Sequence, residues 1–335
     1  MNNRNIAESL MKTDRSISSK KSFKLLNKNI IQQSRLFWVL LLFIIIASIV
    51  SPNFTQVDNI INILRQVSIV GIIAVGMTFV ILTGGIDLSV GSIVAVVAVV
   101  SAQLLAAGIP IFLVLILGAL LGALIGGING LGVAKWNIPP FIMTLGIMVA
   151  ATGFALTLAN GQPISLGKAA TSFYWLGGGS FLGLPVPVWI FILVVFSSII
   201  VLKYTSFGRN VYAVGDNKEA ARLSGINVKL TEFSVYSICG FLSSITALIL
   251  ISRLTVGEPT AGTGYELDAI AMVVIGGTSL AGGQGGVIGT VFGAAIIALI
   301  SNILNLMGVN PFTQQIVKGA IIVLAVYLET RRRKL

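Results

Sequence analysis

The sequence contains no histidine, a single cysteine and few charged residues. Of its 335 residues only 10% are charged, whereas 56% are hydrophobic. A soluble domain carries about 25% charged residues, so this composition excludes a water-soluble fold. A structural zinc site needs about four Cys or His ligands and a cysteine nucleophile needs a base, so we expect neither here. Cys239 stands in the apolar segment VYSICGFL and is expected to be a small buried residue.

A phosphate-binding loop of the form G-x-x-x-x-G-K-[ST] is also missing. Gly161 and the pair Gly167 and Lys168 have the wrong spacing, and Ala169 follows where a hydroxyl side chain is needed. The chain is therefore not expected to hydrolyse ATP by itself, to bind a cofactor directly or to act as an enzyme.

The positive charge is concentrated in three polar segments. Of the 22 Lys and Arg, eight lie in residues 1–35, five in 203–229 and four in 331–334. Short cytoplasmic loops of membrane proteins carry an excess of Lys and Arg, so all three segments are expected in the cytoplasm. The basic residues do not cluster with stacking aromatic residues, which argues against a nucleic-acid partner.

Ten apolar stretches predict an all-α fold, a polytopic integral membrane helical bundle of about ten transmembrane helices with both termini cytoplasmic. The stretches lie near 36–50, 61–83, 92–109, 111–134, 138–159, 186–202, 232–252, 267–281, 286–307 and 316–328. The stretches 267–281 and 316–328 are short, so one of them is expected to be only half-inserted. Residues 1–35 form a basic cytoplasmic tail, either a short amphipathic helix or disordered; 36–330 form the transmembrane domain; and 331–335 form a basic cytoplasmic C-terminus.

Glycines recur every four residues in two of the apolar stretches. One set is Gly118, Gly122, Gly126 and Gly130, and the other is Gly285, Gly289 and Gly293. Each set lines one face of a helix and allows a neighbouring backbone to come close. We interpret both sets as packing faces.

Two glycine-rich breaks interrupt the apolar pattern. GGIDLSVG at 84–91 and GGTSLAGG at 276–283 share the skeleton GG-x-x-L-x-x-G, which is either an internal repeat or a coincidence of high glycine content. Irregular backbone at membrane depth needs burial in protein or a water-lined cavity, so we expect the breaks to form the inner closure of a translocation path. Asp87 is either an N-cap for a helix beginning near Leu88 or a charged part of that closure. The pore or gate candidates are Gly84, Gly85, Asp87, Ser89, Gly276, Gly277 and Thr278.

Polar residues inside the apolar stretches are uncharged. They are Thr78, Thr83, Gln103, Asn129, Thr144, Thr152, Thr157, Asn302 and Asn305. Ion-coupled carriers and pumps usually place ionisable residues within their spans. A neutral, hydroxyl-rich solute therefore fits this inventory better than a proton or an anion.

The polar loop 203–231 contains a strong helix-forming segment, NKEAARLS, between Gly215 and Gly225. Its apolar positions, Ala220, Ala221 and Leu223, have little within their own loop to bury against. The segment is therefore predicted to be a short helix at the membrane face that packs either into the groove of another protein or against its own bundle.

Three stretches resemble the membrane permeases of bacterial binding-protein-dependent ABC sugar importers. They are AVGMTFVILTGGIDLSVGS at 74–92, GDNKEAARLSGINV at 215–228 and PTAGTGYELDAIAMVVIGGTSLAGGQG at 259–285. The resemblance covers nearly the whole chain from about residue 36. It implies a permease in the bacterial inner membrane that carries a neutral monosaccharide, with ribose expected and allose, xylose and autoinducer-2 as alternatives. An autonomous secondary sugar transporter is the alternative of another class.

The resemblance also implies partners. These are a cytoplasmic ABC ATPase that binds ATP and Mg²⁺, a periplasmic sugar-binding protein, a second permease copy and membrane lipid. Glu219, Ala220, Ala221 and Gly225 match the EAA-x-x-x-G motif through which such permeases engage the ATPase. The expected ATPase-coupling residues are Lys218, Glu219, Ala220, Ala221, Arg222 and Gly225.

A segment between Arg253 and Asp268 is expected on the periplasmic face. It carries Glu258, Glu266 and Asp268 among glycines. These acids either dock the sugar-binding protein or cap helices on an ordinary loop.

Overall fold

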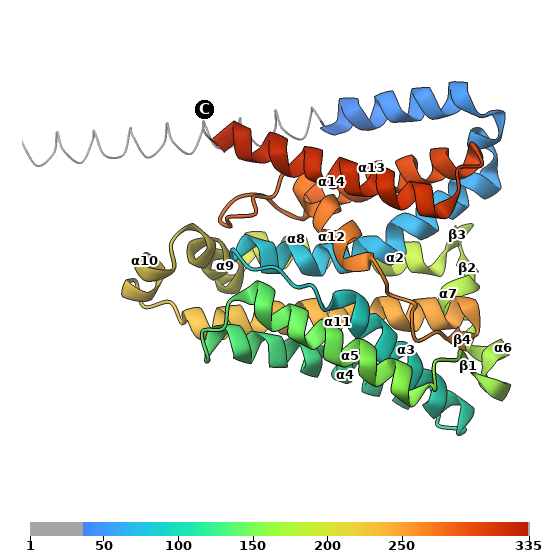
Figure 1. The fold of residues 1–335 in the computed structure, drawn as a ribbon, viewed down its shortest axis with the longest axis horizontal. Coiled ribbons are helices and arrows are strands. Elements are labelled where there is room, and N and C mark those ends of the chain that lie inside the picture. The colour runs from blue at the N-terminus through green and yellow to red at the C-terminus, as the bar shows by residue number, and fades with distance from the viewer. Residues whose placement is uncertain (1–35, 334–335) are drawn as a thin grey trace, which may run out of the picture.

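The computed structural model describes residues 36–333 and consists mostly of helices (Figure 1). Its first helix spans Leu36–Val50. The longer helices that follow are α2 (Val57–Leu82), α3 (Val90–Ala106), α4 (Ile111–Ala134), α5 (Pro140–Leu158), α8 (Val186–Tyr204), α9 (Ser206–Asp216), α11 (Val228–Leu254), α12 (Tyr265–Ile275), α13 (Val287–Leu306) and α14 (Pro311–Arg333). Each apolar stretch named from the sequence overlaps one of these helices. The tail 1–35 lies outside the described residues.

Short elements connect the helices. They are the 3₁₀ helices η1 (Pro52–Thr55) and η2 (Gly167–Ala169), the helices α6 (Ala170–Phe173), α7 (Trp175–Gly178) and α10 (Lys218–Leu223), and the strands β1 (Ile164–Ser165), β2 (Ser180–Phe181), β3 (Leu184–Pro185) and β4 (Val256–Gly257). Strand β1 pairs with β4, and β2 with β3, both antiparallel. The strands lie at one end of the molecule, the strand end, and α9 and α10 lie at the other, the α10 end (Figure 1).

Within residues 36–333, six helices are long and apolar enough to cross a membrane. They are α2, α4, α5, α8, α11 and α13. A helix satisfies every backbone hydrogen bond internally, which is why apolar segments of this length fold as helices in lipid. The helix Leu36–Val50 and α3 are apolar but shorter.

Helix α12 is too short to cross a membrane. Its 11 residues correspond to about 16 Å at 1.5 Å per residue, against a hydrocarbon core of about 30 Å. The stretch expected to be apolar helix through 281 ends at Ile275 because Gly276 and Gly277 follow, and Gly277 has φ +85°. Helix α14, which includes the other short stretch, 316–328, has 23 residues and ends at Arg333. The basic C-terminus expected from 331 therefore begins inside a helix.

The first glycine set and two members of the second pack helices closely, as expected, whereas Gly285 lies outside α13 in the preceding break, with φ +124°. A Cβ at Gly122 would overlap the carbonyl oxygen of Gly240, and one at Gly126 would overlap that of Tyr236, so α4 lies directly against the backbone of α11. A Cβ at Gly289 or Gly293 would likewise overlap backbone atoms of Gly276 or Met272 at α12. Such contacts replace the hydrophobic driving force that is weak between helices in lipid.

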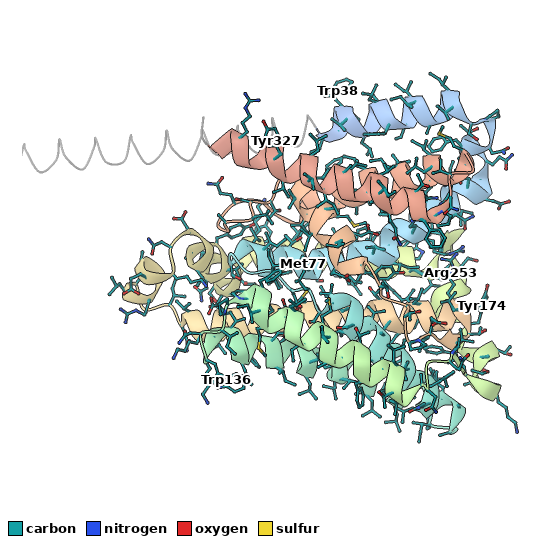
Figure 2. All side chains as sticks on the ribbon, viewed as in Figure 1. Trp38, Met77, Trp136, Tyr174, Arg253 and Tyr327 are labelled. Carbon is teal, nitrogen blue, oxygen red and sulfur yellow. The ribbon has the colours of Figure 1, made fainter. Side chains whose placement is uncertain are left out.

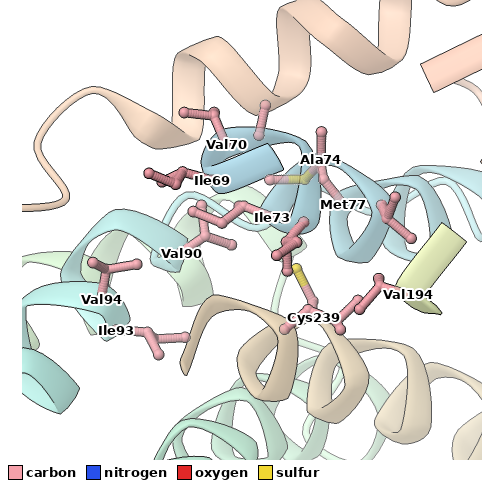
Figure 3. Close-up of a cluster of buried hydrophobic side chains, with 14 of the residues drawn as sticks. Ile69, Val70, Ile73, Ala74, Met77, Val90, Ile93, Val94, Val194 and Cys239 are labelled. Atoms are coloured by element: carbon pink, nitrogen blue, oxygen red, sulfur yellow. The ribbon is translucent and has the colours of Figure 1, made fainter. Parts of the chain in front are cut away.

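The centre of the molecule is an apolar core made by α2, α3 and α11 with parts of α8 and α13 (Figure 3). Helices α2 and α11 are the most buried of the six long helices and α5 is the least. Cys239 of α11 is fully buried in this core, as expected, and packs against Gly76 of α2.

Candidate functional site

The first break leads from the α10 end into the interior. Helix α2 ends at Leu82, residues 83–89 follow as turns and extended chain, and α3 begins at Val90 (Figure 1). Gly84 has φ +78°, a conformation that favours glycine. A Cβ at Gly85 would overlap the hydroxyl of Tyr236. Gly84 therefore allows the backbone to turn, and Gly85 allows the side chain of Tyr236 to come close.

Asp87 lies at the centre of a buried polar cluster. Its side chain is fully buried, and Oδ1 accepts hydrogen bonds from the backbone amide of Ser89 at 2.9 Å and from its hydroxyl at 2.7 Å. The side-chain amide of Asn129, from α4, donates to the Ser89 hydroxyl oxygen at 2.7 Å. Within residues 36–333, Oδ2 of Asp87 and Oδ1 of Asn129 have no hydrogen-bond partner. The cluster is therefore rich in acceptors.

Asp87 is not the N-cap of α3, because that position is held by Ser89, but its hydrogen bond resembles that of an N-cap. An N-cap side chain accepts from the amide two or three residues on, which is what Asp87 does with Ser89. The regular helix nevertheless begins at Val90 rather than near Leu88. Asp87 thus stabilises the turn that leads into α3.

The second break, residues 276–286, joins α12 to α13. Thr278 is fully buried; its amide donates to the carbonyl of Val273 at 3.1 Å, and its hydroxyl oxygen accepts from the amide of Gly286 at 3.2 Å. Gly276 packs against the backbone of Gly289. These contacts fold the break back onto the start of α13.

The two breaks touch each other. The amide of Gly283 donates to the carbonyl of Leu82 at 2.9 Å, and a Cβ at Gly84 would lie 3.5 Å from the carbonyl oxygen of Ala281. The structure therefore brings Gly84 beside the second break, while Asp87 and Ser89 lie against α4.

The shared skeleton GG-x-x-L-x-x-G does not mark equivalent structures. Gly84 has a positive φ while its counterpart Gly276 has φ −62°. Gly91 lies within α3, whereas its counterpart Gly283 lies in a loop with φ +71°. The four shared letters thus fold differently, which favours coincidence over an internal repeat.

The segment NKEAARLS forms the expected short helix, α10, and both of its ends are capped. The side chain of Asn217 accepts from the amides of Glu219 at 3.0 Å and Ala220 at 2.9 Å. At the other end Gly225, with φ +83°, donates to the carbonyl of Arg222, and the amide of Ile226 donates to that of Ala221. This pair of bonds is a Schellman motif, so Gly225 in the EAA-x-x-x-G pattern ends the helix.

Helix α10 presents one buried face and one exposed face. Ala221 is buried against its own chain, whereas Glu219, Ala220, Arg222 and Leu223 are exposed. Arg222 donates to Glu219 at 3.1 Å, and this hydrogen bond and the positive charge lower the pKa of Glu219. Lys218 forms an ion pair of 2.6 Å with Glu232 of α11, which is largely buried. The helix is thus anchored on one side and free on the other.

A groove of about 380 Å³ lies beside α10. Its walls come from α10, from the turn between α4 and α5, and from the start of α11; the lining includes Val133, Ile138, Pro139, Lys218, Arg222 and Glu232. Trp136, in the same turn, is 60% exposed and stands at the α10 end, opposite Tyr174 and Arg253 at the strand end (Figure 2).

The three acids expected on the periplasmic face do not share one surface. Glu258 follows β4 at the strand end and accepts from the hydroxyl of Thr260 at 2.9 Å. Glu266 lies in the first turn of α12, where a Cβ at Gly91 would meet its carboxylate. Asp268 is paired with Lys318 of α14 at 2.8 Å, and both side chains are partly buried.

Several residues at these sites escaped the sequence analysis. Asn129 stands among polar residues of the apolar stretches, but nothing local links it to Asp87, 42 residues earlier. Tyr236 is fully buried in α11 with its hydroxyl against the first break. Helix α9 was also not anticipated, although its N-cap Thr205 accepts from Gly208 at 3.2 Å.

Comparisons with known proteins place the chain among membrane transport proteins. The family described as "Branched-chain amino acid transport system / permease component" matches residues 59–326. No solved structure matches the chain.

The curated relatives include ribose and xylose permeases. The ribose import permease of Haemophilus influenzae is 46% identical over 306 residues, which cover 90% of this chain and 95% of that protein. The ribose import permease of Bacillus subtilis is 48% identical over 296 residues, covering 88% and 92%. The xylose transport system permease of Escherichia coli is 37% identical over 342 residues, covering 84% and 87%. The chain therefore belongs to this family of membrane transport permease components.

Proposed function

We propose that this chain is the permease subunit of an ATP-driven ribose importer in a bacterial inner membrane. The observation that carries the proposal is its identity of 46% and 48% to two ribose import permeases over at least 88% of its length. The xylose permease is less similar, at 37%. This difference favours ribose over xylose as the cargo.

The proposed topology has about ten helices in the membrane and both termini in the cytoplasm. The α10 end carries the basic loop 203–231, and the C-terminal end of α14, with its basic residues, lies on the same side (Figure 1). The excess of Lys and Arg on cytoplasmic loops supports this orientation. The strand end then faces the periplasm.

The proposed ATPase contact is the exposed face of α10. ATP and Mg²⁺ bind to the partner ATPase, and this chain receives its motion through Glu219, Ala220 and Arg222. Three other residues hold α10 in place. Lys218 pairs with Glu232, Ala221 is buried and Gly225 ends the helix.

The two glycine-rich breaks form the proposed inner closure of the sugar path. The two breaks meet at the α10 end. Apart from the carboxylate of Asp87, the polar groups in and around them are hydroxyls, side-chain amides and backbone groups. Such groups suit a neutral sugar, which is recognised through hydrogen bonds. At the strand end, Glu258 is the proposed contact for the sugar-binding protein.

Reconstitution in lipid vesicles tests the function. The permease is combined with its cognate ATPase and sugar-binding protein, and uptake of labelled ribose is measured with ATP, with a non-hydrolysable analogue, and without each partner. We expect ATP-dependent uptake that requires both partners and that unlabelled ribose suppresses at lower concentrations than xylose or allose.

Two other outcomes would contradict the proposal. Accumulation of sugar by the permease alone along an ion gradient would identify a secondary transporter. ATP-dependent uptake of xylose, allose or autoinducer-2 in preference to ribose would keep the importer and reject the cargo.

A further inference from the structure

Three separate segments converge at the C-terminal end of α2, near Leu82. They are the first break at Gly84, the second break at Gly282 and Gly283, and the C-terminal end of α9 at Gly215. We call these four glycines the glycine junction. Their contacts are made mainly by backbone atoms, so the segments fit together with almost no side chain between them.

Gly215 is the most restricted of the four. A Cβ at this position would overlap the carbonyl oxygen of Leu82 and lie 2.5 Å from the amide nitrogen of Gly283. Gly215 has a helical rather than a positive φ, so backbone conformation does not demand glycine here. The close approach of α9 to both other segments does.

Hydrogen bonds fix the same arrangement. The carbonyl of Leu82, in the last turn of α2, belongs to the group that helices leave unpaired, and the amide of Gly283 satisfies it at 2.9 Å. The hydroxyl of Tyr212 in α9 donates to the carbonyl of Gly285 in the second break at 3.0 Å. Helix α9 is therefore attached to the second break by one hydrogen bond, at Tyr212, and by the close packing of Gly215 against Gly283.

The junction is also directly connected to α10. Helix α9 ends at Asp216, and only Asn217, which caps α10, separates the two helices. A displacement of α10 is thus transferred to α9 over a single residue, and from α9 to both breaks through the junction.

We propose that Gly215 and Tyr212 are positioning residues that make α9 and the two breaks move as one body, so that motion of α10 opens and closes the inner end of the sugar path. This inference rests on the proposed function, because it assumes that a partner ATPase moves α10. It adds residues outside the EAA-x-x-x-G motif to the coupling apparatus.

Two substitutions test the proposal in the reconstituted importer. Gly215→Ala forces a methyl group between α9 and Leu82, and Tyr212→Phe removes only the hydrogen bond to Gly285. We expect ribose transported per ATP hydrolysed to fall at least tenfold for Gly215→Ala and two- to fivefold for Tyr212→Phe, while the ATPase still co-purifies and hydrolyses ATP.

The chain offers matched controls. Gly319→Ala adds a methyl group to a helical glycine of α14 that has no neighbouring heavy atom within 4 Å in the described part of the chain. Tyr204→Phe changes a tyrosine that is 67% exposed next to α9. Both controls are expected to keep the parent ratio of ribose to ATP. A purely structural role for Gly215 and Tyr212 would lower uptake and ATP hydrolysis together and leave that ratio unchanged, which would overturn the proposal.

A disulfide tests whether the junction moves as one body. A Cβ at Gly283 would lie 3.3 Å from the Cβ of Asp216, close to the mean of about 3.8 Å found in disulfides. In a Cys239→Ala background, Asp216→Cys with Gly283→Cys is expected to form a cross-link and to retain ribose uptake when oxidised. The same protein under reducing conditions controls for the strain of a side chain at Gly283.

The outcomes separate this inference from the proposed function. A parent complex without ATP-dependent ribose uptake would refute the function. An active parent whose cross-linked form loses uptake and regains it on reduction would refute the single moving body. Should Gly215→Ala fail to fold, Tyr212→Phe and the cross-link decide the question.

Discussion

Asp87 places a carboxylate among acceptors in the interior of the molecule. One oxygen accepts two hydrogen bonds from Ser89, and within the described part of the chain the other has no partner. A buried polar group without a partner costs about 1 to 3 kcal/mol, so the side chain is retained for the bonds that Oδ1 makes. These bonds shape the turn into α3.

Asparagine at position 87 should therefore preserve function. Asp87→Asn keeps an acceptor for Ser89 and replaces the partnerless oxygen with a donor, whereas Asp87→Ala leaves the Ser89 amide unpaired and lowers the free energy of unfolding by about 1 to 3 kcal/mol. We expect parent ribose uptake and unchanged thermal stability for the Asn variant, and a lower melting temperature for the Ala variant.

Failure of Asp87→Asn to transport in a fully assembled complex would contradict this expectation. In that case the negative charge itself would be needed at the inner closure, as the charged-gate interpretation of Asp87 requires.

At the scale of single elements, α10 is a six-residue helix that is too short to be stable alone. Asn217 caps its start, the Schellman motif at Gly225 ends it, and Lys218 ties it to Glu232. These contacts leave Leu223 at its tip 75% exposed. A single exposed leucine is ordinary on a protein surface, so a substitution is needed to test whether the proposed ATPase contact covers it.

Leu223→Asp should disrupt ATPase binding without unfolding the permease. Because Leu223 is exposed, the charge costs little in the free subunit, but in a covered contact it would be buried unpaired. We expect at least a tenfold loss of ATPase co-purification with unchanged thermal stability. Leu182→Asp is the matched control, since Leu182 is 77% exposed at the strand end. Equal ATPase recovery with both variants would remove α10 from the interface.

Helices α12 and α14 are linked by the ion pair between Asp268 and Lys318. The pair is part-buried, so removing one partner leaves the other charge unpaired but costs less than the roughly 3 to 5 kcal/mol of a fully buried pair. Lys318→Met should therefore reduce the yield of folded protein, and Asp268→Lys combined with Lys318→Asp should recover part of it.

The reversed pair also tests whether Asp268 contacts the sugar-binding protein. If the charge serves only α12 and α14, the concentration of binding protein for half-maximal ATPase stimulation stays at the parent value. An increase in that concentration, while stability is recovered, would assign Asp268 to the docking surface. Glu258→Lys, at the strand end, is expected to raise the concentration of binding protein needed for half-maximal ATPase stimulation.

For the whole molecule, one face of α5 is open. Helix α5 is the least buried of the six long helices, and within residues 36–333 neither Gly146 nor Gly153 on its exposed side has a neighbouring heavy atom within 4 Å. Small residues on an open helix face allow close approach of another helix. We therefore expect the second permease copy to pack against this face.

Cysteine cross-linking in vesicles tests this dimer contact. In a Cys239→Ala background, Gly153→Cys is expected to form a covalent dimer on oxidation. Leu193→Cys, on α8 and 66% exposed, is expected to remain monomeric as a lipid-facing control. Cross-linking at Leu193 and not at Gly153 would place the second copy on another face.

Local properties of the sequence determined the class of the protein and much of its secondary structure. The apolar stretches and the clustered basic residues identify a helical membrane protein, because hydropathy and charge act over a single segment. The glycine faces and the short helix α10 were predicted for the same reason. The length of α12 and the existence of α9 were not predicted, because a glycine turn ends α12 and a capping residue starts α9.

Only the tertiary structure decided which segments form the site. Asp87 meets Asn129, Asp268 meets Lys318, and Gly215 meets Leu82 and Gly283. Partners that are 40 or more residues apart leave no periodic pattern in the sequence, since each contact depends on how several helices pack at once. The repeated letters of the two breaks show the same limit, because identical residues adopt different backbone conformations when different neighbours surround them.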